Sequence, residues 1–191
     1  MGALSIWHYL IILLFIVVMF GIVMLASALR RPKKEDGANL NPYAGVRGWL
    51  ALLVAGLFVF GPLMLLGQTE GVLRDAELAY PKLLQLSQWS TYKSSVWGVV
   101  LVCIALSLWA AWGLMKGNTF GHVRRAQVVL WVIGPAKNFA LSLILPVVIF
   151  GHSSFDGQAL GALLASAIVA LIWTLYLQLS KRVKATYPIG R

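Results

Sequence analysis

The chain has 191 residues and a mean hydropathy of +0.82; 60% of its residues are hydrophobic and only 12% are charged. So few charges cannot cover a water-facing surface, which excludes an ordinary soluble domain and predicts a membrane protein. The formal net charge of +10 does not predict nucleic-acid binding, because the basic residues are concentrated between apolar runs.

The first apolar run, residues 4–29, is long enough for a membrane-spanning helix. A cleaved signal peptide is the alternative, since residues 26–28, Ala-Ser-Ala, look like a small-residue cleavage site. However, no Lys or Arg precedes the run, which is longer than a typical signal core of roughly 7–15 residues. We predict an amino-terminal transmembrane anchor over residues 1–29 and a basic cytoplasmic linker over residues 30–44.

Four further apolar runs have the length of a bilayer-spanning helix, about 20 residues at ~1.5 Å each. They cover residues 47–67, 95–115, 126–150 and 159–180. The run at 126–150 is irregular, because Gly134-Pro135 and Pro146 should interrupt its helix. A short tail closes the chain at residues 188–191.

The segment 68–94 is predicted as the longest loop, on the periplasmic side. Apolar residues recur in it at helical spacing with charges between them, as in Val72, Leu73, Ala76 and Ala79. This pattern indicates short amphipathic helices lying on the membrane surface or capping the bundle. An ordinary solvated loop is the alternative.

The basic residues predict the topology. Twelve Lys and Arg residues lie in the linker with Arg47, the loop at 116–125 and the carboxyl end, against three in the segments 68–94 and 151–158. By the positive-inside rule the first group is cytoplasmic. We therefore predict an all-α, polytopic membrane bundle of five transmembrane helices, with the amino terminus outside and the carboxyl terminus inside.

Two stretches of the chain resemble a known family. Residues 45–50, GVRGWL, are similar to the opening signature of the DUF2569 family of bacterial inner-membrane proteins, and residues 180–187, SKRVKATY, to its closing signature. The resemblance covers about residues 45–187 and implies a four-helix domain in the bacterial inner membrane. It implies no known activity, and the amino-terminal helix is an addition to the family pattern.

That added helix has a weaker resemblance of its own. Residues 5–8, SIWH, and the later Phe20-Gly21 are similar to the amino terminus of TatA-type subunits of the twin-arginine translocase. Those subunits become polar after this pair and form a surface helix, whereas here the apolar run continues. The resemblance therefore does not support a translocase role.

Lys137 and Asn138 form the candidate polar site within the membrane. A cation there costs at least ~2.5–3.5 kcal/mol, so an intramembrane charge is a functional candidate. The alternative is snorkelling: with a span boundary near Leu130, Lys137 is about seven residues or ~10 Å deep, and its flexible stem covers much of that distance.

Small residues recur at four-residue spacing in the last span, and they allow helices to approach closely. Packing within the monomer and a seam between two copies both use such a face. The predicted helix-packing face consists of Gly161, Ala162, Ala165, Ser166 and Ala170.

We predict no catalytic, cofactor or metal site. His8, His122 and His152 are scattered, without an HExxH motif or metal-ligand spacing. His152 and Asp156 share a short outer loop and could bind a proton or ion, although a solvated loop explains them as well.

Basic clusters at the predicted cytoplasmic side attract anionic lipid headgroups, at about 1 kcal/mol per residue. We name this set the basic rim: Arg30, Arg31, Lys33, Lys34, Arg124, Arg125, Lys181, Arg182 and Lys184. The expected partners are membrane lipids, together with a second copy of the chain or another membrane protein.

The sequence leads to three functional hypotheses. A non-enzymatic accessory, scaffold or complex-forming protein of the inner membrane comes first, because packing features are plentiful and chemical motifs are scarce. A small transporter or channel with a polar site at the broken fourth helix is second, and a membrane enzyme is third.

Overall fold

The computed structural model describes residues 45–117, 119–152 and 155–187. Within these ranges the regular structure is helical and contains no strand. Four helical rods are long and apolar enough to cross a bilayer: Trp49–Ala79, Ser87–Lys116, Phe120–Phe150 and Gly157–Leu179. The predicted anchor at residues 4–29 lies outside the described residues, so the five-span count remains a prediction.

The first rod contains α2 (Trp49–Ala55), a π-helical segment (Gly56–Phe60) and α3 (Gly61–Ala79). The π-helical segment has a wider turn than an α-helix. It lies directly before Pro62, which has no backbone N–H to donate to the preceding turn. The N–H of Gly61 bonds to Gly56, and the hydroxyl of Ser107 from the next rod donates to the carbonyl of Leu57. The side chain of a neighbouring helix thus supplies a donor where the proline cannot.

The segment 68–94 is neither a loop nor a set of separate surface helices, which corrects the expectation from sequence. Helix α3 continues to Ala79, a 3₁₀ turn occupies Pro81–Gln85, and α4 (Ser87–Lys116) begins directly after it. The loop was predicted because the hydropathy falls after Gly67. Acidic and basic residues lower the hydropathy of a segment, but they are compatible with a helix, and α3 continues through them. Helix α3 ends at Ala79, and Tyr80 has a non-helical backbone (φ −132°, ψ 76°), because the helical region is disfavoured for a residue before proline.

One carboxylate joins the two helices of this hairpin. Glu77 Oε1 in α3 accepts hydrogen bonds from Lys93 Nζ at 2.7 Å and from Trp89 Nε1 at 3.0 Å, both in α4. Two of the charges that lower the hydropathy of this segment, Glu77 and Lys93, therefore form an ion pair between α3 and α4.

The third rod is broken internally, and the fourth is continuous. The third consists of α5 (Phe120–Trp131), a π-helical segment (Val132–Ala136), α6 (Lys137–Phe139), a second π-helical segment (Ala140–Ile144) and α7 (Leu145–Phe150). Gly151 then ends α7 in the left-handed conformation, with φ 78°, that favours glycine. The fourth rod is α8 (Gly157–Leu179), followed by the short α9 (Lys181–Thr186).

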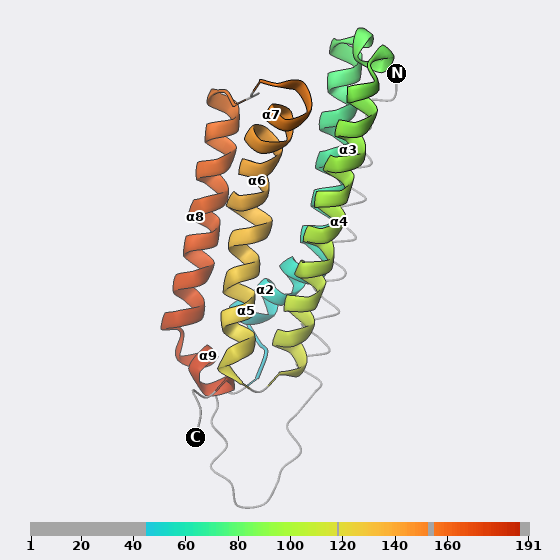
Figure 1. The fold of residues 1–191 in the computed structure, drawn as a ribbon. Helices are drawn as coiled ribbons and strands as arrows, with labels where there is room; N and C mark the ends of the chain where they lie inside the picture. The colour runs from blue at the N-terminus through green and yellow to red at the C-terminus, as the bar shows by residue number, and fades with distance from the viewer. Residues whose placement is uncertain (1–44, 118, 153–154, 188–191) are drawn as a thin grey trace, which may run out of the picture.

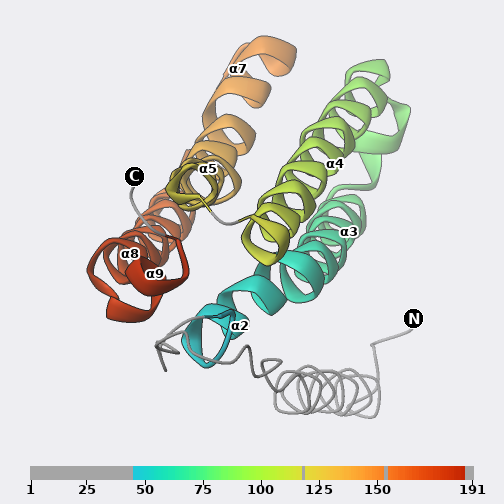
Figure 2. The same cartoon turned by 90° about the horizontal axis from the view of Figure 1, so that it is seen from below.

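The rods stand side by side in the order α3, α4, α5–α7 and α8 (Figures 1 and 2). Helix α2 departs from this row and lies across its lower end, between α4 and the α8–α9 corner. The rings of Trp49 in α2 and Trp173 in α8 are 6.5 Å apart. We call this lower end, where α2, α4, α5, α8 and α9 meet, the closed end.

The closed end contains the larger buried core. Its members come from those five helices, from the π-helical segment after α2, and from Tyr187: Leu50, Leu53, Val54, Leu57, Ala110, Ala111, Leu114, Val123, Ala126, Val129, Leu130, Leu177, Val183 and Tyr187. The Tyr187 hydroxyl donates to the carbonyl of Leu114, in the last turn of α4, where helical carbonyls lack helical partners. Burial raises the pKa of Tyr187 to about 12.

A second hydrogen bond at the closed end joins the first and last parts of the described chain. The backbone N–H of Gly45 donates to Thr186 Oγ1 at 3.0 Å, across 141 positions of sequence. The two signatures that resemble the family are therefore in direct contact.

The opposite end, which we call the hairpin end, is more open. A smaller core holds α3, α4 and α7 together: Leu65, Leu73, Trp89, Val96, Val100 and Cys103. Beyond it, the α3–α4 hairpin rises above α7 and α8 (Figure 1). Apolar side chains at its tip are exposed, with Leu78 71% and Val72 69% accessible.

Candidate functional site

The broken rod carries the polar residues that the sequence predicted within the membrane. Pro135 lies inside the first π-helical segment, and its missing N–H explains the local loss of regular α-helical bonding. A second π-helical segment follows after only three residues, so Lys137 and Asn138 lie between two widened turns. Such single-turn π segments occur frequently at functional sites.

Lys137 lies near the middle of its rod. It is about 12 residues, or roughly 18 Å, beyond Arg125 at ~1.5 Å per residue, and a similar distance from the far end at Phe150. The four-carbon stem of a lysine is shorter than either distance. Within the described residues Lys137 forms no hydrogen bond or ion pair.

The half-buried Lys137 borders a groove between α4 and the broken rod. The groove has a volume of about 410 Å³ and is lined by Ser95, Gly98, Val99, Val102, Cys103, Val132, Ala136, Lys137 and Ala140. Its walls are mostly apolar, and Cys103 is a buried free thiol. The Lys137 ammonium, which has no carboxylate partner among the described residues, thus faces an apolar groove.

Asn138 faces a different neighbour. Its Nδ2 donates to the Ala162 carbonyl at 3.3 Å and to Ser166 Oγ at 3.1 Å, both in α8. The Asn138 carbonyl accepts a hydrogen bond of 2.6 Å from Ser142 Oγ. The structure therefore does not bring Lys137 and Asn138 to one polar cavity: Lys137 faces α4, whereas Asn138 fastens the broken rod to α8.

Only part of the small-residue face of α8 packs against the rest of the bundle. Ser166 lies against Gly134, where an added Cβ would meet it at 3.6 Å, and Ala170 is buried. Gly161 and Ala165 are exposed in the structure, and a Cβ added to Gly161 would meet nothing within 4 Å. Ala162 is also exposed, although its carbonyl accepts the bond from Asn138.

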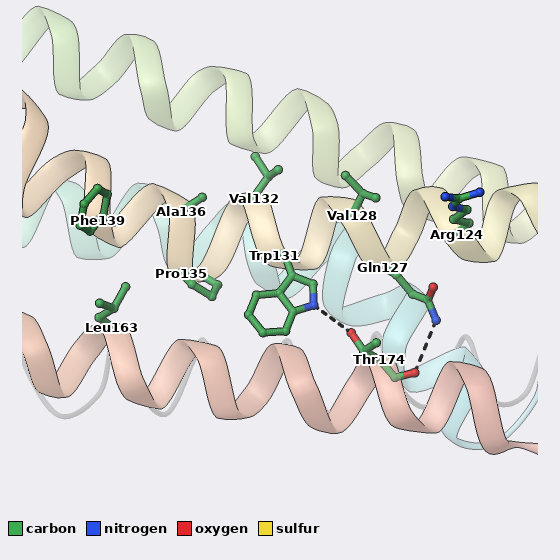
Figure 3. A pocket seen from close by; sticks show the side chains of 10 residues that line it. All are labelled: Arg124, Gln127, Val128, Trp131, Val132, Pro135, Ala136, Phe139, Leu163 and Thr174. Atoms are coloured by element: carbon green, nitrogen blue, oxygen red, sulfur yellow. Dashed lines mark hydrogen bonds between the residues drawn. The ribbon is translucent and has the colours of Figure 1, made fainter.

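A larger groove lies on the other side of the broken rod, between α5 and α8 (Figure 3). It has a volume of about 650 Å³ and is lined by Arg124, Gln127, Val128, Trp131, Val132, Pro135, Ala136, Phe139, Leu163 and Thr174. Trp131 Nε1 donates to Thr174 Oγ1 at 3.2 Å, and Gln127 Nε2 to the Thr174 carbonyl at 3.5 Å.

Sequence reasoning missed this groove. It assigned Arg124 to the basic rim and gave no role to Gln127, Trp131 or Thr174. A signal was present, because Arg124, Val128, Trp131, Pro135 and Phe139 recur every three or four residues and so lie on one helical face. The opposite wall, supplied by α8, could not be read from that pattern.

The described members of the basic rim gather at the closed end of the bundle. Arg124 and Arg125 lie at the start of α5, and Lys181, Arg182 and Lys184 lie in α9. Arg125 lies over the Trp109 ring, at 5.3 Å from its centroid. Residues 30–34, the remaining part of the rim, lie outside the described residues.

The two histidines of the described ranges lie at opposite ends of the bundle, His122 in the first turn of helix α5 and His152 in the bend after α7. The ring of His122 packs against Gly117, where a Cβ would meet it at 2.0 Å. His152 Nδ1 lies 3.0 Å from the Phe150 carbonyl, and Asp156 caps α8 by accepting the N–H of Ala159 at 2.8 Å. His152 and Asp156 thus have separate local contacts with the backbone.

Within the described residues the chain is all-helical, and its four apolar rods have the length and composition of the spans of a multi-pass membrane protein. The sequence profile described as "Protein of unknown function (DUF2569)" matches residues 43–188, which is most of the chain. The chain therefore belongs to the DUF2569 family, as the two signatures predicted. No curated protein and no solved structure matches it. The TatA-like detail lies outside the described residues and is not confirmed.

Proposed function

We propose that the protein is a non-enzymatic accessory or scaffold protein of the bacterial inner membrane, which forms a complex with another membrane protein through its hairpin end. The proposed topology has five spans, with the amino terminus outside and the carboxyl terminus inside. The observation that carries this proposal is the projecting α3–α4 hairpin, whose apolar tip is exposed.

The position of the charges supports a hairpin outside the apolar layer. The first charge in α3 is Glu70, and the last nine or so residues of the helix therefore extend roughly 14 Å beyond the uncharged part at ~1.5 Å per residue. On that stretch and its turn, Val72, Leu78, Tyr80, Leu84 and Leu86 are exposed. Exposed apolar residues within a charged, water-facing segment are typical of a protein–protein contact.

The polar groups inside the rods support a packing role. Ser107 donates to Leu57 in α2–α3, Asn138 donates to α8, and Ser142 and Ser166 donate to backbone carbonyls. These groups fasten helices to each other or to their own backbone. Such contacts are the polar packing contacts expected between membrane helices.

The charge distribution supports the topology. The described basic-rim residues lie at the closed end, whereas Glu70, Asp75 and Glu77 lie on the hairpin. The positive-inside rule then assigns the closed end to the cytoplasm and the hairpin to the periplasm. Cysteine labelling at Arg31 and Lys184 tests this topology, and labelling of these positions from opposite sides would reject it.

Site-specific photocrosslinking in native membranes tests the complex. A photoreactive residue at Leu78 or Leu84 should give the same adduct of defined mass, whereas Leu101, which is exposed in the middle of α4, should not. The captured protein should then co-purify at a fixed stoichiometry with the unmodified chain. Leu78→Glu should remove it and Leu101→Ala should retain it; co-purification unaffected by Leu78→Glu would reject the proposal.

A small transporter or channel is the second candidate, and Lys137 is the observation that favours it. The ammonium lies deep in a rod between two π-helical segments and faces a groove of about 410 Å³. A cation deep within an apolar rod, without an ion-pair partner among the described residues, is a candidate binding group in an anion pathway.

Chloride efflux from reconstituted vesicles tests this second candidate. Flux through the wild-type protein should disappear in Lys137→Met and persist in Lys93→Met, which removes a cation from the hairpin instead. Wild-type vesicles that release chloride no faster than protein-free vesicles would reject anion conduction.

A further inference from the structure

The groove between α5 and α8 is one continuous face of the broken rod with a second wall from α8 (Figure 3). Arg124, Val128, Trp131, Pro135 and Phe139 follow each other at three- or four-residue spacing along the first wall. Pro135 and Ala136 line it with short side chains, and the Trp131 indole donates a hydrogen bond to Thr174 across it.

The chemistry changes along the groove. Arg124, Gln127 and Thr174 supply charge and polar groups at the end nearest the closed end of the bundle. Past Trp131, the lining consists of Val132, Pro135, Ala136, Phe139 and Leu163. A complementary ligand must have a charged head and a long apolar tail.

The length of the groove matches one leaflet of a bilayer. Arg124 and Phe139 are about 15 residues apart, or roughly 22 Å at ~1.5 Å per residue. Half of a bilayer, including its headgroup layer, is about 20–22 Å thick. An acyl chain that follows the apolar wall therefore places its headgroup beside Arg124.

The charge at the head of the groove selects an anion. Arg124 is exposed and forms no hydrogen bond or ion pair within the described residues. The acidic residues of those ranges, Glu70, Asp75, Glu77 and Asp156, lie on the hairpin or at the far end of α8, so none of them competes for Arg124. A guanidinium binds phosphate through a planar fork of N–H donors.

We infer that this groove is a binding site for one anionic phospholipid. Its phosphate contacts Arg124, its glycerol region lies beside Gln127 and Thr174, and one acyl chain follows the wall from Val128 to Phe139. The site differs from general attraction at the basic rim, because it requires one particular arginine and one particular groove. It does not depend on the accessory role proposed above.

Brominated lipids test the site in the purified full chain, solubilised in an uncharged detergent. Phosphatidylglycerol with a brominated acyl chain should quench Trp131 fluorescence, measured as the signal that Trp131→Phe removes. Brominated phosphatidylcholine should bind at least fivefold more weakly. One lost cation near a lipid surface corresponds to about fivefold in affinity, so Arg124→Gln should weaken phosphatidylglycerol binding by that factor.

Arg125→Gln is the matched charge control, since Arg125 is the next residue along but lies over the Trp109 ring. It should retain the affinity, and Arg124→Lys should restore most of it. Leu163→Trp should fill the groove and weaken both lipids, whereas Leu164→Trp, at an exposed position that does not line the groove, should weaken neither. This second pair keeps the test valid if Arg124→Gln does not fold.

Two results would overturn the inference. Equal losses in Arg124→Gln and Arg125→Gln would show surface attraction without a site. Equal binding of the two lipids to the wild-type protein would show an apolar contact without selection of the headgroup.

Discussion

The closed end and the hairpin end of this bundle share helix α4 but are packed to different degrees. At the closed end, five helices surround a core whose largest members, including Tyr187, Leu50 and Leu114, are fully buried. At the hairpin end, α3 and α4 extend past their neighbours with exposed apolar side chains (Figure 1). We therefore expect substitutions at the closed end to reduce the stability of the bundle more than substitutions at the hairpin end.

The largest effect should come from Leu114→Ala at the closed end. Leu114 has no exposed surface, and truncation of a buried leucine leaves a cavity that costs about 2–5 kcal/mol. The free energy of unfolding, measured by SDS titration in mixed micelles, should fall by this amount. A change below about 1 kcal/mol would contradict the assignment of the main core to this end.

Tyr187→Phe should have the next largest effect. The substitution keeps the ring but removes the hydroxyl that donates to the Leu114 carbonyl, and a buried acceptor left without a donor costs about 1–3 kcal/mol. The same titration measures the loss.

The pKa of Tyr187 sets the pH range of that measurement. It is raised from 10.0 to about 12 in the folded protein, so the contribution of the neutral phenol is complete below pH 10 and is lost as the pH rises towards 12. The difference between Tyr187→Phe and wild type should therefore be constant between about pH 7 and 9. A strong dependence on pH within that interval would contradict a protonated hydroxyl in this contact.

Thr186→Val should have a smaller effect at the same end. Valine keeps the shape of threonine but cannot accept the 3.0 Å hydrogen bond from the Gly45 N–H. A typical hydrogen bond contributes about 0.5–1.5 kcal/mol, which is the expected decrease in the free energy of unfolding. Thr186→Ser should retain the bond and serves as the control.

Leu78→Ala at the hairpin tip should have the smallest effect on stability. Leu78 is 71% exposed, and exposed substitutions usually change the free energy of unfolding by less than about 0.5 kcal/mol. In the purified chain the titration curve should therefore match that of wild type. A loss comparable to that of Leu114→Ala would remove the contrast between the two ends.

The four described spans could be predicted from sequence because length and hydropathy depend directly on the thickness of the bilayer. The prediction placed an end at Gly67, whereas the helix continues to Ala79. Hydropathy indicates whether a helix is surrounded by lipid or by water. The charges from Glu70 onward indicate that this part of α3 is in water, but they do not end the helix. Pro81, the first residue of the 3₁₀ turn, was the better indicator of the true boundary.

The candidate sites were only partly predictable. Gly134-Pro135 correctly indicated a break, and Lys137 follows that break directly, as its position in the run predicted. The sequence could not show that Asn138 faces α8 while Lys137 faces α4, because that depends on how the widened turns rotate the helix. Nor could it show Thr174 beside Trp131, because the two residues belong to different rods.

The contact between Gly45 and Thr186 has a consequence for how this domain can be rearranged. The family profile spans residues 43–188, and a hydrogen bond joins Gly45 to Thr186, each two residues inside one limit of that stretch. Domains whose ends lie close together tolerate circular permutation. A short peptide could therefore connect residue 188 to residue 43, and new termini could be opened between α7 and α8, with the same four rods assembling in a different chain order.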